Sequence, residues 1–155
     1  MMKVRNAEEI AALYDHDYLA WIEATTECLQ QRDYSNIDWE NLIEEIASLG
    51  RDDKRRLETD LVVVLRHLLK RQYTPDHRNC KWELNLVEHR RRILENLETS
   101  PSLKAFMVRE LPESYVDSVG QASIETGLPK DKFPTNCPYT VEQILDEDFL
   151  PEVAV

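Results

Sequence analysis

Apolar residues recur at steps of three and four over much of the chain, the spacing of one face of an α-helix. This pattern predicts a first helix from Ala7 to about Arg32. A second helix is predicted to begin after Asp38, a residue type favoured as an N-cap. Because Gly50 follows the apolar residues of this second helix, we expect a left-handed cap to end the helix there. Those apolar residues form a single stripe: Trp39, Leu42, Ile43, Ile46 and Leu49.

The longest apolar segment predicts a third helix, from about Asp52 to Tyr73, which ends before Pro75. Val63 lies away from its main apolar face, so this helix is expected to be covered on more than one side and to be central. A polar loop over residues 74–80 then leads to a fourth helix, about Lys81 to Leu97. The main apolar face of the third helix holds Leu57, Leu61, Val64, Leu65, Leu68 and Leu69.

The last third of the chain is less regular. Two shorter helices are predicted, Pro101–Glu110 and Pro112–Thr126, the latter ended by Gly127. Three prolines then indicate an extended segment, and the capping-box spacing of Thr140 and Gln143 predicts a short helix over residues 141–146. No stretch has the alternation of a strand. The sequence therefore predicts an all-α fold, a bundle of about four main helices with an extended, proline-containing C-terminal arm ending in a short helix.

Length and charge narrow the class of protein. A chain of 155 residues predicts a single domain over residues 1–155, with a core bundle of about 7–126 and an arm of about 127–155. The net charge of −11 divides into −8 for residues 1–50, +5 for residues 51–92 and −8 for residues 93–155. An acidic total argues against general nucleic-acid binding. The basic middle either forms one local anion-binding face or pairs with the acidic flanks within the fold.

We find no sequence signal for insertion into a membrane or for export to an oxidising compartment. The N-terminal residues lack the apolar core of a signal peptide, and no apolar run approaches the length of about 18 residues that spans a bilayer. The three cysteines are odd in number, far apart and without CxxC spacing. A cytoplasmic protein without membrane contact is the expectation.

Candidate chemistry lies where polar residues border the apolar faces. His67 and Lys70 stand near the end of the third helix, and we expect both to border an apolar seam between helices and to have partners within the molecule. Glu45 borders the stripe of the second helix, whereas Glu44 points away from it. If the second and third helices form an antiparallel hairpin, Glu45 lies far from His67.

Motifs for known cofactors are missing. The sequence has no P-loop, no GxGxxG, no HExxH, no Glu-x-x-His and no Cys/His cluster of zinc spacing, so neither a metal nor a cofactor is predicted. Arg71 and His77 match the Arg-to-His spacing of all-helical ribonucleases of the HEPN kind, but Pro75 separates them. No catalytic residue follows from the sequence.

Five segments in this order resemble an uncharacterised bacterial family, abundant in cyanobacteria: domain-of-unknown-function family twenty-nine. The resemblance covers Tyr14 to Pro151 and implies an all-helical domain of unknown activity. Residues that match the family and also look polar and semi-buried are candidates for a binding site: Glu44, Glu45, His67, Lys70, Trp82 and Arg91. The segments are "YDHDYLAWIE", "IDWENLIEEIASLGR", "LRHLLKRQYTP", "LVEHRRRILENLETSPSL" and "FPTNCPYTVEQILDEDFLP".

These observations favour a small interaction or regulatory protein without catalysis, which contacts a second copy of itself or another protein through an exposed apolar patch. One alternative is a metal-binding or RNA-cleaving helical enzyme that uses Glu45, His67 and either Lys70 or Arg71. The other is a local binder of anions or RNA through the basic segment 66–92.

Overall fold

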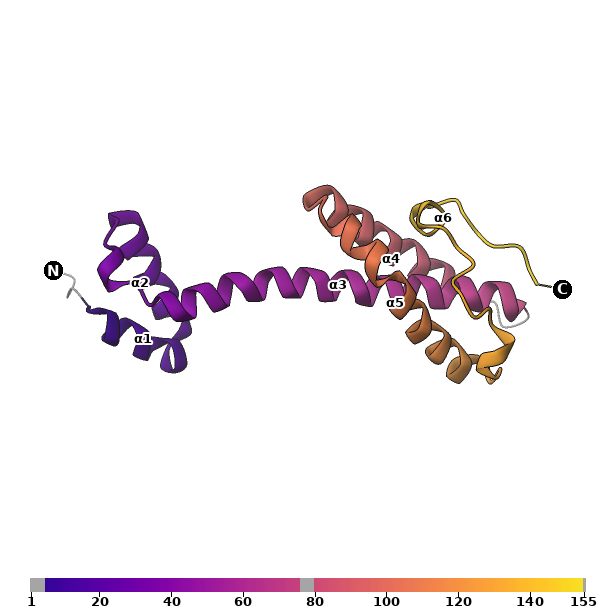
Figure 1. Cartoon of the computed structure of the whole chain (residues 1–155), viewed down its shortest axis with the longest axis horizontal. Coiled ribbons are helices and arrows are strands. Elements are labelled where there is room, and N and C mark those ends of the chain that lie inside the picture. Colours follow the sequence, from indigo (N-terminus) through magenta and orange to yellow (C-terminus); the bar gives the residue numbers. More distant parts are fainter. Residues whose placement is uncertain (1–4, 76–79, 155) are drawn as a thin grey trace. The chain divides into compact units, whose positions relative to one another are not determined.

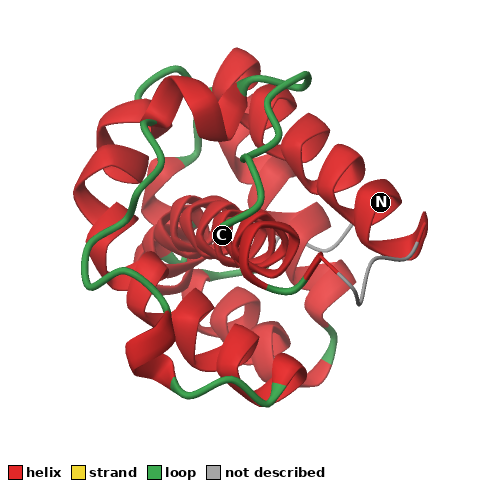
Figure 2. Cartoon of the chain, turned by 90° about the vertical axis from the view of Figure 1, so that its right-hand side faces the viewer, coloured by secondary structure: helices red, strands yellow, loops and turns green. Residues whose placement is uncertain are grey.

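The computed structural model describes residues 5–75 and 80–154, and within these residues it contains helices and no strand (Figure 2). The all-α class predicted from the sequence is confirmed. The chain divides into two compact units, Met1–Arg51 and Asp52–Val155. The elements in chain order (Figure 1) are α1 (Ala7–His16), α2 (Tyr18–Gln31), η1 (Tyr34–Asn36), α3 (Trp39–Tyr73), α4 (Cys80–Thr99), α5 (Leu103–Thr126), η3 (Lys130–Lys132) and α6 (Val141–Leu145).

In the first unit, the single helix predicted from Ala7 to about Arg32 is wrong, because two helices meet at Asp17. The backbone of Asp17 departs from helical geometry (φ −150°, ψ 82°), and its carboxylate accepts a hydrogen bond from the N–H of Ala20, which makes it the N-cap of α2. This cap starts a new helix at Asp17, although the helical spacing of apolar residues continues on both sides of it. A small core then forms from Ile10, Trp21, Cys28 and Ile37.

The helix end predicted at Gly50 is also wrong, because α3 runs unbroken from Trp39 to Tyr73. Gly50 does not adopt the positive φ that a left-handed cap requires. A glycine inside a helix costs only about 1 kcal/mol, which is too little for one glycine to end the helix. The hairpin considered between two separate helices is therefore one continuous helix.

Gly50→Ala is expected to raise the free energy of unfolding by about 1 kcal/mol, because alanine has the higher helix propensity. A Cβ atom added at this position meets nothing within 4 Å. Urea denaturation followed by circular dichroism measures the change. Gly127→Ala is the opposing control: Gly127 has φ +75°, so alanine there is expected to destabilise the protein.

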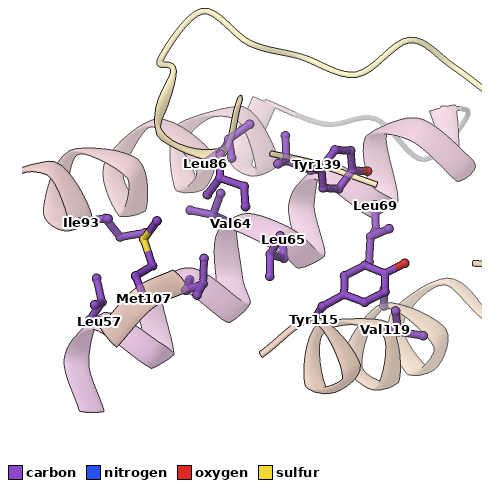
Figure 3. Close-up of a cluster of buried hydrophobic side chains, with 14 of the residues drawn as sticks. Leu57, Val64, Leu65, Leu69, Leu86, Ile93, Met107, Tyr115, Val119 and Tyr139 are labelled. Atoms are coloured by element: carbon purple, nitrogen blue, oxygen red, sulfur yellow. The ribbon is translucent and has the colours of Figure 1, made fainter. Parts of the chain in front are cut away.

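The second unit holds the main core, in which α3 is covered by α4, α5 and the C-terminal arm (Figure 3). The predicted apolar face of α3, from Leu57 to Leu69, is fully buried, as expected. Val63 on the other side is half-buried, in agreement with a central helix. The arm contributes Phe133, Tyr139 and Ile144 to the same core.

Two helices predicted around Pro112 are one helix, α5, so that prediction is wrong. Proline removes one backbone hydrogen bond and costs about 3 kcal/mol inside a helix. Met107 before it and Tyr115 after it are both buried in the core, and this packing keeps the helix continuous. At the end of α5, Gly127 adopts the left-handed cap that the sequence predicts.

The C-terminal arm is also bound by Arg90 of α4, which is 1% exposed. Its guanidinium donates to the carbonyl oxygens of Ile144 at 2.9 Å, Phe149 at 2.8 Å and Gln143 at 3.2 Å. The short helix α6 begins with the predicted capping box between Thr140 and Gln143. One buried cation on α4 thus fixes the backbone of the arm.

Candidate functional site

Three of the six predicted site residues meet in the second unit: His67 and Lys70 on α3 and Trp82 on α4. The Lys70 ammonium lies 3.8 Å from the centroid of the Trp82 ring, in a cation–π contact. It also donates a hydrogen bond of 2.6 Å to Glu125 on α5. Lys70 is only 4% exposed, so both contacts compensate a buried charge. Lys70 therefore has the internal partners expected from the sequence.

The carboxylate of Glu125 completes this cluster. Burial raises its pKa, but the hydrogen bond from Lys70 and the positive charges of Arg66 and Lys70 outweigh burial and lower the pKa below its usual value. Arg66 lies 3.5 Å from the same carboxyl group. Glu125 thus stays ionised and neutralises two cations of α3.

His67 differs from Lys70, because neither of its ring nitrogens has a hydrogen-bond partner among the residues described. The expectation of an internal partner is wrong for His67. The side chain is 4% exposed. Burial, reinforced by the charges of Lys70 and Arg66, lowers its pKa to about 4, so the imidazole is neutral at pH 7.

His67 lines a cavity of about 20 Å³ together with Thr74 of the α3 C-terminus, Trp82 of α4 and Leu150 of the arm. A volume of roughly 10–15 Å³ on the same measure accommodates one water molecule. The cavity is therefore of the size of a single water, and its lining includes an imidazole that can donate one hydrogen bond and accept another.

The other predicted site residues lie apart from this cluster. Glu44 pairs with Arg51 at 2.5 Å, and Arg91 pairs with Glu95 at 2.5 Å, both on the surface, where such pairs contribute little. Arg71 pairs with Glu83. His77, the second member of the ribonuclease-like spacing, lies outside the described residues.

Glu45 belongs to the first unit, where it joins α3 to α1 and α2. The hydroxyls of Tyr14 and Tyr18 donate to its two oxygens at 2.5 and 2.7 Å. These hydrogen bonds lower the pKa of Glu45 and raise that of Tyr14 to about 12. Glu45 therefore belongs to a different unit from His67 and Lys70.

Among residues 5–75 and 80–154, no group of three or more His, Cys, Asp or Glu side chains is placed to hold a metal ion. In the same part of the chain, no helix combines the length and apolar character needed to cross a bilayer.

Most of the apolar stripe that the sequence predicts on the helix after Asp38 lies on the surface. Ile43 and Ile46 are each 62% exposed and Leu49 is 67% exposed, while Trp39 at the start of the same helix is 47% exposed. Of the apolar residues predicted on this face, Leu42 packs against the small core of the first unit. We refer to the other four, Trp39, Ile43, Ile46 and Leu49, as the α3 stripe. Its periodicity was visible in the sequence, but its exposure was not.

Comparison with known proteins gives one match. The model of a family described as "Domain of unknown function DUF29" matches residues 13–150. No curated protein and no solved structure matches the chain.

Proposed function

The chain belongs to the family described as Domain of unknown function DUF29, and from that premise, which names no activity, we propose a non-catalytic interaction module that pairs with a second copy of itself through the α3 stripe. The observation that carries this proposal is the exposure of Ile43, Ile46 and Leu49, each more than three-fifths accessible on one helix. Large apolar side chains gathered on one surface are typical of protein–protein contacts.

The sizes of the side chains favour an antiparallel pair of α3 helices. At 100° per residue, Ile43 and Ile46 share a side of the helix with the small residues Ala47 and Gly50. Antiparallel pairing about a two-fold axis places Ile43 opposite Gly50 of the second copy, and Ile46 opposite its Ala47. Large residues then face small ones, which allows close approach of the two backbones.

The charges beside the stripe favour the same arrangement. Glu44 and Arg51 lie on the same flank of α3, two helical turns apart, the acidic residue nearer the N-terminus. In an antiparallel pair, the same flank of each helix faces the other copy, and the two helices run in opposite directions. Glu44 of one copy therefore lies near Arg51 of the second copy. The exposed flank is therefore complementary to itself, which supports a second copy as the occupant.

We propose no catalysis because two of the polar candidate residues, Glu45 and Lys70, already have partners within the protein. Glu45 accepts hydrogen bonds from two tyrosines, and Lys70 is bound to Glu125 and Trp82. Side chains that are held by such contacts fix the positions of the helices that carry them. An enzymatic role for Glu45, His67 and Lys70 would require side chains from two separate units to act on one substrate.

Sedimentation equilibrium of the full chain tests the proposal. We expect a dimer, and we expect Ile43→Glu with Ile46→Glu to weaken self-association by at least about tenfold for each residue, because each loses apolar burial and gains a charge. Ile124→Glu is the matched control, since Ile124 is 84% exposed on α5 and outside the stripe.

Charge reversal gives an independent arm of the same test. Glu44→Arg or Arg51→Glu alone is expected to weaken the dimer, and the two together are expected to restore much of the affinity. Circular dichroism verifies that each variant is folded. A wild-type chain that stays monomeric over the accessible concentrations, or an Ile124→Glu variant that dissociates as readily as the stripe variant, would overturn self-pairing through α3.

A further inference from the structure

A groove of about 490 Å³ lies between α3 and α4 within the second unit. It is distinct from the α3 stripe and from the small cavity at His67. Its volume is within the range of roughly 300–1,000 Å³ that is typical of small-molecule sites. Its charged and amide-bearing lining comes from Arg55, Arg56 and Asp60 on α3 and from Arg92, Glu95 and Asn96 on α4.

The two carboxylates of the groove have partners of their own. The buried carboxylate of Asp60 lies 2.6 Å from Nδ1 of His89 and 3.9 Å from the guanidinium of Arg92. Glu95 accepts a hydrogen bond of 2.5 Å from Arg91, which does not itself line the groove. The negative charge of the groove is therefore largely compensated from its sides.

The arginines from α3 are less closely paired. Arg55 and Arg56 approach Asp52 and Asp53 of the preceding turn at 3.9 Å, at the limit of an ion pair. Their side chains are 76% and 72% exposed. Two guanidinium groups thus remain available for a ligand at the edge of the groove, and the open charge of the site is positive.

This position differs from the basic segment 66–92 singled out by charge alone. In that segment Lys70 pairs with Glu125, Arg71 with Glu83 and Arg91 with Glu95. Cations engaged in such pairs must first give up a carboxylate to bind an anion. The less closely paired arginines of α3 therefore make the better anion site.

We propose that this groove binds the phosphate group of a small phosphorylated compound that also carries hydroxyl groups. Guanidinium groups match the geometry of phosphate through paired N–H donors, and Arg55 and Arg56 supply them. Asp60, at the floor, accepts a hydrogen bond from a ligand hydroxyl, and the amide of Asn96 offers both a donor and an acceptor. The inference is independent of dimer formation.

Calorimetric titration at low ionic strength tests the site with three probes: ribose 5-phosphate, inorganic phosphate and ribose. We expect ribose 5-phosphate to bind most tightly, inorganic phosphate more weakly, and ribose not at all. Arg55→Gln with Arg56→Gln is expected to weaken binding of the sugar phosphate by at least about tenfold. Arg109→Gln, an exposed arginine on α5 that does not line the groove, should bind like the wild type.

Asp60→Asn separates phosphate recognition from hydroxyl recognition. It is expected to reduce the advantage of ribose 5-phosphate over inorganic phosphate, and circular dichroism checks that the variant is folded. Three results would overturn the proposal: no binding of either phosphate probe, equal losses in the Arg109→Gln and the Arg55/Arg56 variants, or binding of a single-stranded RNA oligonucleotide without binding of the sugar phosphate.

Discussion

Arg90→Ala is expected to lower the free energy of unfolding by about 3–5 kcal/mol, because it removes a buried cation that binds three backbone carbonyls. Burial lowers the pKa of Arg90, and the acidic Asp146 and Glu147 nearby counter that effect. Truncation leaves the carbonyls of Gln143, Ile144 and Phe149 without this donor and opens a cavity under α6. The arm is therefore expected to separate from α4.

Urea denaturation gives the size of this loss, and hydrogen exchange locates it. Faster exchange is expected in α6 and the rest of the arm, while α5 keeps its protection. Arg90→Lys should recover only part of the stability, because an ammonium is a point charge and cannot reach three carbonyls. Arg91→Ala is the matched control: its exposed pair with Glu95 is expected to contribute less than about 1 kcal/mol. Equal losses for Arg90→Ala and Arg91→Ala would contradict this account of the arm.

The elements that the sequence predicted well are those fixed by local chemistry. The buried face of α3 from Leu57 to Leu69 follows from spacing, and the start of α6 follows from the capping box of Thr140 and Gln143. The breaks predicted at Gly50 and before Pro112 failed for different reasons. The glycine costs only about 1 kcal/mol, which is too little to end a helix, whereas the proline costs about 3 kcal/mol and its helix is held by the buried Met107 and Tyr115 on either side.

Local sequence patterns could predict only part of the candidate site. Periodicity shows which side of a helix is apolar, but it does not show what covers that side, so the exposure of the α3 stripe could not be predicted. The partner of Lys70 is Glu125, 55 positions later, and no local pattern connects the two. Arg90 is different, because its spacing from Leu86 and Ile93 places it on the buried side of α4. This spacing could have identified Arg90 as buried, although the next residue, Arg91, is exposed.

His67 gives the second large effect, a loss of stability in mild acid. Its pKa of about 4 in the folded protein lies below the value of about 6.5 expected for the unfolded chain. The unfolded state therefore binds a proton first as the pH falls, and folding stability decreases through this window. Between pH 7 and pH 5 the expected loss is roughly 2 kcal/mol, and it levels off below pH about 4.

His67→Leu is expected to abolish this loss, since it removes the imidazole and with it two nitrogens that have no partner among the described residues. At pH 7 the variant should be more stable than the wild type by about 1 kcal/mol, because an apolar side chain replaces an unpartnered polar one. Above pH 5, the titration of His67 is separated from that of the carboxyl groups. Hydrogen bonds lower the pKa of Glu45, and hydrogen bonding together with neighbouring charges lowers that of Glu125. Carboxyl groups with a lowered pKa lose their contribution to stability only at lower pH. Urea denaturation at a series of pH values measures the slope, with His16→Gln as the exposed control. A wild-type slope that persists in His67→Leu would assign the acid sensitivity to another group and would mean that the imidazole is not held neutral in the seam between α3 and α4.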